Sequence, residues 1–346
     1  MRIAVTGSVA TDHLMSFPGH FSDQLLPDQL AHVSLSFLVD SLDVRPGGVA
    51  ANIAYGLARL GHRPLLVGSV GADFEAHGAE LAHLGVDMTA LHVSSARHTA
   101  RFMCTTDEAG NQLASFYTGA MAEASSIDLA EAVGGHGGVD LVHIGADDPD
   151  AMSLHTRACR ALGIPFAADP SQQLARLDGP AIRHLVHEAR LLFTNEYERA
   201  LLLDKTGWHE RDVLTRVGTW ITTRGAKGSV VERCGEPAVE VPAVAVADAV
   251  DPTGVGDAYR AGFLSATAHG HDPVTAAQRG SALASFALRH LGTQTYDPTE
   301  TQLHEALAAT YGPEAAAGPP APHAAADQTT AAQTTATRSA TTRAPR

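Results

Sequence analysis

The stretch Asp251-Pro252-Thr253-Gly254-Val255-Gly256-Asp257 points to both the fold and the chemistry of this chain. Its glycines allow a backbone turn with no bulky side chain on the inner side, so that successive N–H groups can converge on an anion. The helical pattern of residues 258–269 places this turn at a helix N-terminus, where free N–H groups and the helix dipole both favour negative charge. The turn is therefore a candidate anion hole.

Asp257 is the first carboxylate beside this turn. A carboxylate next to an anion hole suits a general base, which takes a proton from a hydroxyl while the amides of Gly254 and Gly256 stabilise charge on a transferring phosphoryl group. The structural alternative is an aspartate that caps a glycine-rich turn. On this motif alone the two interpretations carry equal weight.

Apolar runs with strand and helix character alternate along most of the chain. Residues 49–60 predict a helix, because apolar side chains recur at helical spacing and Gly61 follows as a terminator. The alternation predicts an α/β protein with a largely parallel sheet and helices on both faces. The predicted buried strands are residues 3–9, 64–70, 140–145, 165–168, 191–194 and 220–223.

Two stretches depart from this pattern and predict a small second sheet. Residues 33–39 begin with strand-type alternation, and residues 99–106 and 112–118 flank a hairpin turn that contains a glycine. A hairpin symmetric about the middle of that turn places Phe102 opposite Phe116, with both rings on one face. The rings then form either a platform for a flat ligand ring or a cross-strand pair that only stabilises the hairpin.

Composition narrows the classes of function. The 346 residues suffice for one large α/β domain or two small ones. The net charge of −14 argues against a general nucleic-acid binder, and no apolar run is long enough to span a membrane. The chain opens on a strand-like run without a signal-peptide pattern, and its three cysteines are scattered, so we expect a cytoplasmic protein.

The composition changes after Gly312. We expect one domain over residues 1–312, with a lid contributed by about residues 10–46 and 97–119. Residues 313–346 contain almost no large apolar side chain, so burial cannot offset the entropy of ordering them. We therefore expect a disordered, low-complexity tail.

Polar residues near predicted strand ends complete a candidate ligand site. Asp12 follows the first strand, where open α/β sheets bind ligands, and its carboxylate can bind two vicinal sugar hydroxyls. The pair Gly47-Gly48 permits close backbone approach at the start of the helix that carries Asn52, whose amide can donate to and accept from hydroxyls. The structural alternatives are a surface loop for Asp12 and a helix-entry turn for the glycines.

Two further motifs suit a bound nucleotide. Asn195 and Glu198 are three residues apart and share a face of a helical turn, where their oxygens suit hydrated Mg²⁺. A favourable acidic charge at a helix N-terminus is the alternative. The turn from Thr223 to Gly228 can approach a nucleotide through Gly225 and Gly228, although such a turn is often only a hairpin.

These motifs make residues 1–312 resemble the ribokinase-like (PfkB) family of carbohydrate and nucleoside kinases. Gly47-Gly48 with Asn52 resembles the first family signature and Asp251 to Asp257 the second, while Asn195 with Glu198 is similar to the family's Asn-x-x-Glu motif. The stretches similar to bacterial, particularly actinobacterial, adenosine kinases are residues 5–15, 33–40, 169–174 and 251–263.

The resemblance implies a three-layer α/β/α domain with a small β-sheet lid and an adenosine kinase activity, in which ATP and adenosine give ADP and AMP. It implies Asp257 as the base and Mg²⁺ at the phosphates, and it leaves open a monovalent cation such as K⁺. Open strand edges in the lid also suggest a homodimer. The alternatives are a sugar kinase, which needs no aromatic platform, and a non-catalytic nucleoside-binding protein, which has no need of an intact Asp257.

The resemblance also implies individual contacts for the two substrates. Ribose would contact Ser8, Asp12, Gly48 and Asn52, the base would contact Ser36, Phe102, Phe116, Gln172 and Gln173, and ATP would contact Asn195, Thr223, Gly225, Gly228 and Gly256.

Overall fold

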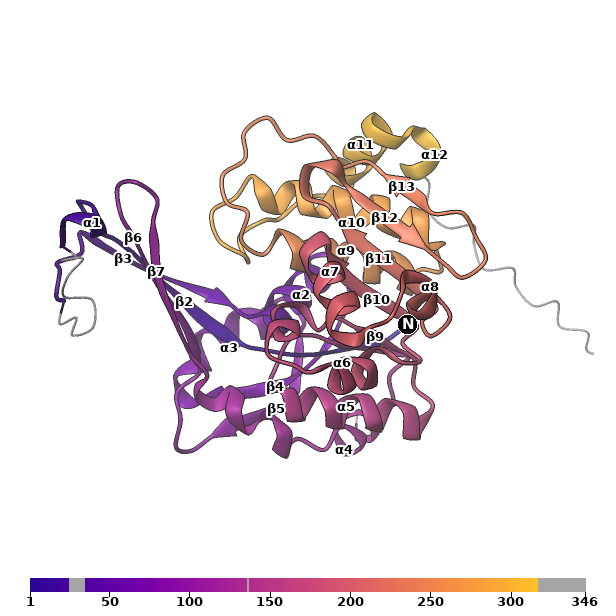
Figure 1. The fold of residues 1–346 in the computed structure, drawn as a ribbon, viewed down its shortest axis with the longest axis horizontal. Coiled ribbons are helices and arrows are strands. Elements are labelled where there is room, and N and C mark those ends of the chain that lie inside the picture. Colours follow the sequence, from indigo (N-terminus) through magenta and orange to yellow (C-terminus); the bar gives the residue numbers. More distant parts are fainter. Residues whose placement is uncertain (25–34, 136, 317–346) are drawn as a thin grey trace, which may run out of the picture.

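The computed structural model describes residues 1–24, 35–135 and 137–316. They form a large sheet between two layers of helices, and a smaller sheet that projects from one side (Figure 1). This confirms the predicted α/β architecture with a separate lid sheet. The predicted disorder of residues 317–346 lies outside the described residues, whereas residues 313–316, which we expected in the tail, form the short helix α12 (Pro313–Ala316).

Within the described part of the chain the large sheet has nine strands in the order β13-β12-β11-β10-β9-β8-β1-β4-β5. Neighbouring strands from β11 to β5 run parallel, while β12 runs antiparallel to both of its neighbours, β11 and β13. Parallel strands are covered on both faces, which explains their continuous apolar runs. The strands are β1 (Ile3–Thr6), β4 (Leu65–Gly71), β5 (Asp87–Ser94), β8 (Leu141–Ile144), β9 (Phe166–Ala168), β10 (Leu191–Asn195), β11 (Thr219–Thr223), β12 (Ser229–Glu232) and β13 (Val239–Val241).

All six predicted buried strands are present in this sheet, as β1, β4, β8, β9, β10 and β11. Two apolar cores lie on its two faces, and each core includes side chains of a separate set of helices. One set comprises α2 (Val49–Arg59), α3 (Glu75–His83), α9 (Val255–Ala268) and α10 (Pro273–Leu288), and the other α4 (Leu129–Gly134), α5 (Pro149–Leu162), α6 (Gly179–Val186), α7 (Glu196–Thr206) and α8 (Glu210–Leu214).

The remaining described helices, besides α12, are α1 (Phe21–Gln24), α11 (Glu300–Tyr311) and the 3-10 helices Ala72–Phe74, Gly119–Ser126, Ser171–Ala175 and Gly225–Lys227. The predicted helix over residues 49–60 is confirmed as α2. Helix α9 begins at Val255, three residues earlier than predicted, with Gly254 as its N-cap at a φ of 72°. Gly256 and Asp257 therefore lie inside the first helical turn.

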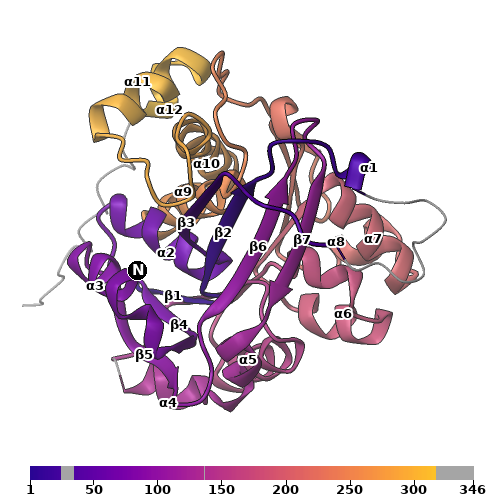
Figure 2. The same ribbon diagram turned by 90° about the vertical axis from the view of Figure 1, so that its left-hand side faces the viewer.

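The smaller sheet, which we call the lid sheet, has four strands among the described residues in the order β3-β2-β6-β7. Figure 2 shows these strands side by side across the near side of the molecule. Phe102 pairs with Phe116 in the register of β6 and β7, as the symmetric hairpin predicts. The lid strands are β2 (Ala10–Ser16), β3 (Ser41–Gly47), β6 (Ala100–Thr106) and β7 (Gln112–Tyr117).

The strand predicted from the alternation of residues 33–39 is wrong for the part that the structure describes. Residues 33 and 34 lie outside the described residues, and residues 35–39 form no strand. The Phe37 ring instead packs against Phe17 and Phe21, with ring centroids 4.8 and 5.4 Å apart. Local aromatic packing thus accounts for Phe37, whereas Leu38 and Val39 are exposed.

Candidate active site

A cavity of about 490 Å³ lies between the lid sheet and the carboxyl ends of β1, β8 and β9. Open α/β sheets bind their ligands at this edge. We call it the acceptor cavity. All predicted substrate residues except Ser36 line it, together with residues that sequence reasoning did not assign. The predicted lining residues are Ser8, Asp12, Gly48, Asn52, Phe102, Phe116, Gln172 and Gln173, and the unassigned ones are Ala10, Val49, Met121, Ala146, Arg176, Thr253 and Thr293.

Ser36 does not line the acceptor cavity. It is exposed, whereas its neighbours Leu35 and Phe37 are partly buried. The packing of Phe37 against Phe17 therefore directs the Ser36 side chain towards solvent. In this conformation the segment contributes an aromatic contact to the lid rather than a polar contact to the cavity.

Four residues form one row across the four lid strands. Arg45 pairs with Asp12, Asp12 pairs with Phe102, and Phe102 pairs with Phe116. Residues paired in register project from the same face of a sheet. The row therefore changes from charged side chains on β3 and β2 to aromatic rings on β6 and β7. Sequence reasoning predicted the aromatic half, but it could not pair Asp12 with Phe102.

Asp12 lies in a crowded and acidic environment. Burial and the nearby Asp251 raise its pKa to about 6, while Arg45 opposes this shift. The Asp12 carboxylate also explains one glycine, because a Cβ at Gly47 would lie 2.7 Å from Asp12 Oδ1. Any larger residue there would displace the carboxylate from the cavity.

The entry to α2 needs its second glycine for close packing. Gly48 has a φ of 93°, and a Cβ there would lie 2.6 Å from the backbone of Ser8 and Ala10. The Ser8 hydroxyl accepts a hydrogen bond of 3.1 Å from the Val49 amide, so it caps the helix. Gly47 and Gly48 therefore form a helix-entry turn, as the structural alternative predicts, and Gly48 also lines the acceptor cavity.

Asp257 lies at the floor of the acceptor cavity, in the first turn of α9. Its Oδ2 accepts a hydrogen bond of 2.8 Å from Asn52 Nδ2. Burial raises the pKa of Asp257 to about 6, and Arg260 and the Asn52 amide oppose the shift. The carboxylate is therefore ionised at neutral pH yet basic enough to accept a proton, as a general base requires.

A buried ionic cluster that sequence reasoning missed supports this carboxylate. Arg260, one turn after Asp257, donates from Nη2 to Asp169 Oδ1 at 2.7 Å and from Nη1 to the Gly256 carbonyl at 3.1 Å. Burial would raise the pKa of Asp169, but Arg260 and His143 together outweigh it and hold that pKa below its usual range. His143 lies 3.2 Å from the same carboxylate. The signal was present, because Asp169 and Arg260 fall in stretches that resemble adenosine kinases.

A second cavity of about 630 Å³ lies on the other side of the anion-hole turn. We call it the nucleotide cavity. It contains every predicted ATP residue except Asn195, and the turn from Thr223 to Gly228 is also the hairpin that joins β11 to β12. The remaining walls were not predicted and are mostly small and apolar. The lining residues are Thr223, Gly225, Ala226, Gly228, Ala243, Val244, Ala245, Val246, Pro252, Val255, Gly256, Tyr259, Ser281, Ala284, Ser285 and Leu288.

Asn195 and Glu198 line neither of these cavities. They form a capping box at the start of α7, in which Glu198 N–H donates to Asn195 Oδ1 and Asn195 N–H donates to Glu198 Oε2, both at 2.8 Å. The other Glu198 oxygen accepts only a long hydrogen bond of 3.3 Å from Ser171. Asn195 and Glu198 therefore cap the N-terminus of α7, which is the structural alternative for this motif. The second Glu198 oxygen can still accept a hydrogen bond from metal-bound water.

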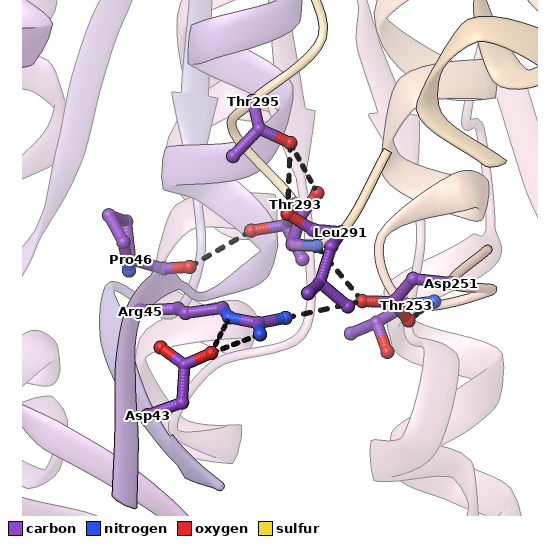
Figure 3. A network of polar contacts seen from close by, with 9 residues as sticks. Asp43, Arg45, Pro46, Asp251, Thr253, Leu291, Thr293 and Thr295 are labelled. Carbon is purple, nitrogen blue, oxygen red and sulfur yellow. Dashed lines mark hydrogen bonds and ion pairs between the residues drawn. The ribbon is translucent and has the colours of Figure 1, made fainter. Parts of the chain in front are cut away.

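The anion-hole turn is fixed to the lid by a polar network (Figure 3). Asp251 accepts hydrogen bonds from the amides of Thr253 and Gly292, at 2.9 and 3.0 Å, and lies 3.7 Å from Arg45 Nη1. Burial opposes ionisation of Asp251, but the hydrogen bonds from Thr253 outweigh it and lower its pKa. The Thr293 hydroxyl donates to a carbonyl of β3 at 2.9 Å. The turn is thus held in place from both sides.

In the ranges 1–24, 35–135 and 137–316, no group of three His, Cys, Asp or Glu side chains is placed to hold a metal ion. In the same ranges, no helix has the length and apolar character that crossing a membrane would need.

Comparison with known proteins agrees with this geometry. A nucleoside kinase of Methanocaldococcus jannaschii is 30% identical over 309 residues, which cover 88% of this chain and 96% of that enzyme. The ribokinase of Bacillus subtilis is 27% identical over 316 residues, or 88% of this chain and 99% of that enzyme. The structure of Burkholderia thailandensis nucleoside kinase in complex with inosine superimposes with a TM-score of 0.79 and 33% identity, and covers 90% of this chain and 98% of that one.

The family model for pfkB family carbohydrate kinases matches residues 7–300. This match includes both glycine-rich signatures, the lid strands and the lining residues of both cavities, which adjoin each other at the first turn of α9. Because the family model covers most of the chain and the Methanocaldococcus jannaschii nucleoside kinase is 30% identical over nearly its whole length, the chain belongs to the pfkB family of ATP-dependent carbohydrate and nucleoside kinases.

Proposed function

We propose that this protein is an adenosine kinase, which transfers the γ-phosphoryl group of ATP to the 5′-hydroxyl of adenosine. The observation that carries the proposal is the row of residues across the lid sheet. Asp12 sits beside the aromatic pair Phe102 and Phe116, so one cavity offers a carboxylate for sugar hydroxyls next to rings for a flat base. A free sugar would use only the first half of this row.

Gln173 supports a base that carries N–H groups. Its Nε2 donates to the Asp147 carbonyl at 2.7 Å, which fixes the amide, and its buried Oε1 has no hydrogen-bond partner among the described residues. A buried acceptor without a partner is costly, so a ligand N–H donor at this position is favoured. The exocyclic amine of adenine is such a donor.

The proposed reaction uses Asp257 and the first turn of α9. The Asp257 carboxylate accepts the proton of the 5′-hydroxyl as that oxygen bonds to the γ-phosphorus, and the bond between the γ-phosphorus and the bridging oxygen breaks to release ADP. The amides of Gly256 and Asp257 lie in the first helical turn, where N–H groups have no acceptor within the helix. They are the donors that would stabilise charge on the transferring group.

Magnesium would enter with ATP and neutralise phosphate charge. The residues present fit a hydrated ion better than a directly bound one, because the capping box already engages Asn195 Oδ1 and one Glu198 oxygen. Contact through water is the arrangement we propose for this pair.

The experiment is an assay of ADP release from purified protein with Mg-ATP, with adenosine, inosine, ribose and fructose offered in parallel. We expect AMP from adenosine and no turnover of the free sugars. Preferred phosphorylation of inosine, the ligand of the Burkholderia thailandensis enzyme, would keep the nucleoside class and replace adenosine. Preferred turnover of ribose would favour a sugar kinase, which the similarity to a ribokinase makes the second candidate. Parallel assays with and without K⁺ test the expected monovalent cation.

We also propose a homodimer through the lid sheet. Edge strand β3 exposes Leu42 and Val44, and edge strand β7 exposes Leu113 and Tyr117. Exposed apolar side chains on unpaired sheet edges are typical of an interface. Sedimentation of the protein and of a Leu42→Lys, Val44→Lys variant tests this, and a wild-type monomer would contradict it.

A further inference from the structure

A chain of hydrogen bonds leads away from Asp257 towards α3. Asn52 Nδ2 donates to Asp257 Oδ2 at 2.8 Å, and Asn52 Oδ1 accepts from Gln294 Nε2 at 2.9 Å. Gln294 Oε1 lies 2.9 Å from His77 Nε2. The four side chains come from α9, α2, the segment after α10, and α3, so only the folded structure brings them together.

The ionised carboxylate sets the direction of every bond in this chain. A carboxylate can only accept, so Asn52 must present its amino group to Asp257 and its carbonyl oxygen to Gln294. Gln294 must then donate through its own amino group, which leaves its oxygen facing His77. His77 is therefore protonated on Nε2.

The environment of His77 fits this role as a fixed donor. The ring is partly buried and packs edge-on against Phe74, with centroids 4.9 Å apart. Its Nδ1 is buried and has no hydrogen-bond partner among the described residues. Burial lowers the pKa of His77, which Gln294 and Glu80 oppose, so the ring is neutral at physiological pH. The neutral form then carries its single proton on Nε2.

We propose that Gln294 and His77 are positioning residues that hold Asn52 with its amino group towards Asp257 and so favour the ionised base. This proposal rests on the proposed function, because it assigns to Asp257 the role of general base. Neither residue belongs to the motifs that identify the family in the sequence, and His77 lines neither the acceptor cavity nor the nucleotide cavity.

The other charged and titratable groups near Asp257 are Arg260 on its own helix, Asp12 on β2, Asp169 after β9, and Tyr296 in the segment that carries Gln294. None of them is substituted in the variants that alter the hydrogen-bond chain. A shift in the titration of Asp257 between the variants below therefore reports on the chain itself.

The sharpest test is Gln294→Glu. The new carboxylate can only accept, so Asn52 must turn its amino group away from Asp257 and its oxygen towards it. This turn and the added negative charge both disfavour ionisation of Asp257. In the wild type, turnover should fall as the pH drops through about 6, because the base becomes protonated. We expect the variant to move this acid limb of kcat upward by roughly one pH unit.

His77 supplies a second test that introduces no charge. His77→Phe removes the donor and frees the Gln294 amide to rotate, so we expect kcat near neutral pH to fall roughly 2–10-fold. His77→Gln can again donate a hydrogen bond and should restore most of the loss. The matched control is His62→Phe, because His62 is also partly buried and bonds a side chain of α9, Ser265, at 2.8 Å without touching this chain.

The outcomes separate this proposal from the proposed function. An acid limb that stays at the wild-type pH in Gln294→Glu, with normal thermal melting, overturns the positioning role. If Gln294→Glu does not fold, the two His77 variants provide the test. Equal kcat values for His77→Phe, His77→Gln and wild type would then overturn the positioning role. Full activity of Asp257→Asn would instead refute Asp257 as the base and with it the proposed mechanism.

Discussion

The acceptor cavity and the nucleotide cavity meet at the first turn of α9 but are built from different chemistry. The acceptor cavity presents carboxylates, amides and two aromatic rings, carried on the lid sheet and on helical segments that follow strands of the large sheet or begin beside them. The nucleotide cavity presents mostly small and apolar residues, together with a few hydroxyl groups and no charged side chain among its described lining residues. One cavity can recognise its ligand through specific side chains, whereas the other is suited to shape and backbone contacts. We therefore expect the acceptor to be selected by contacts with specific side chains, and the nucleotide to be selected by the shape of its cavity and by backbone contacts.

The two aspartates that bound the anion-hole turn show the same contrast. Asp251 accepts hydrogen bonds from its own turn and has a lowered pKa, which stabilises its charge in the folded state. Asp257 has a raised pKa because burial outweighs its partners. The first carboxylate holds the turn in shape, and the second is the one that we propose as the general base.

The largest expected effect comes from removing the base between the cavities. Asp257→Asn keeps the shape of the side chain but cannot accept the hydroxyl proton, so we expect kcat to fall by at least ~10²-fold while both substrates still bind. Stopped-flow or quench-flow assays with saturating substrates measure this. Near-wild-type turnover would show that the assigned base is wrong.

The second-largest expected effect is a loss of affinity for the ligand of one cavity only. Phe102→Ala should weaken adenosine binding by roughly 1–3 kcal/mol and leave ATP binding nearly unchanged, because a base-stacking ring is lost from one cavity only. Tyr117→Ala is the matched control, since Tyr117 lies in the same hairpin and does not line the cavity. Calorimetry with each ligand decides, and equal losses for both ligands would mean that Phe102 only supports the fold.

The smallest effect is the reverse experiment in the nucleotide cavity. Ala284 lies on α10 in the cavity wall, so Ala284→Leu narrows the space without altering a polar group. We expect KM for ATP to rise roughly tenfold, with adenosine affinity unchanged. If both affinities fall together, the two cavities are not independent, and recognition of the two ligands is not divided between them.

Much of the architecture was predictable because local patterns report burial. The six buried strands and the helix α2 follow from apolar periodicity, and the pairing of Phe102 with Phe116 follows from hairpin symmetry. The placement of Ser36 was not predictable in the same way, because it depends on the packing of Phe37 against an aromatic residue of another segment. The start of α9 was misplaced because a left-handed Gly254 caps the helix earlier than the apolar pattern suggests.

By itself, the sequence determined the fold class, the anion-hole turn and most residues of the acceptor cavity. The fold class and the turn depend on residue type and on neighbours in the chain, whereas Ser8, Gln172 and Gln173 were assigned through the resemblance to adenosine kinases. Only the tertiary structure decided that Asp12 lies in one row with Phe102, that Arg260 and Asp169 support Asp257, and that Gln294 connects Asn52 to His77. The physical reason is distance along the chain. Contacts between residues about a hundred or more positions apart are fixed by sheet order and helix packing, and a single sequence carries no local signal for them.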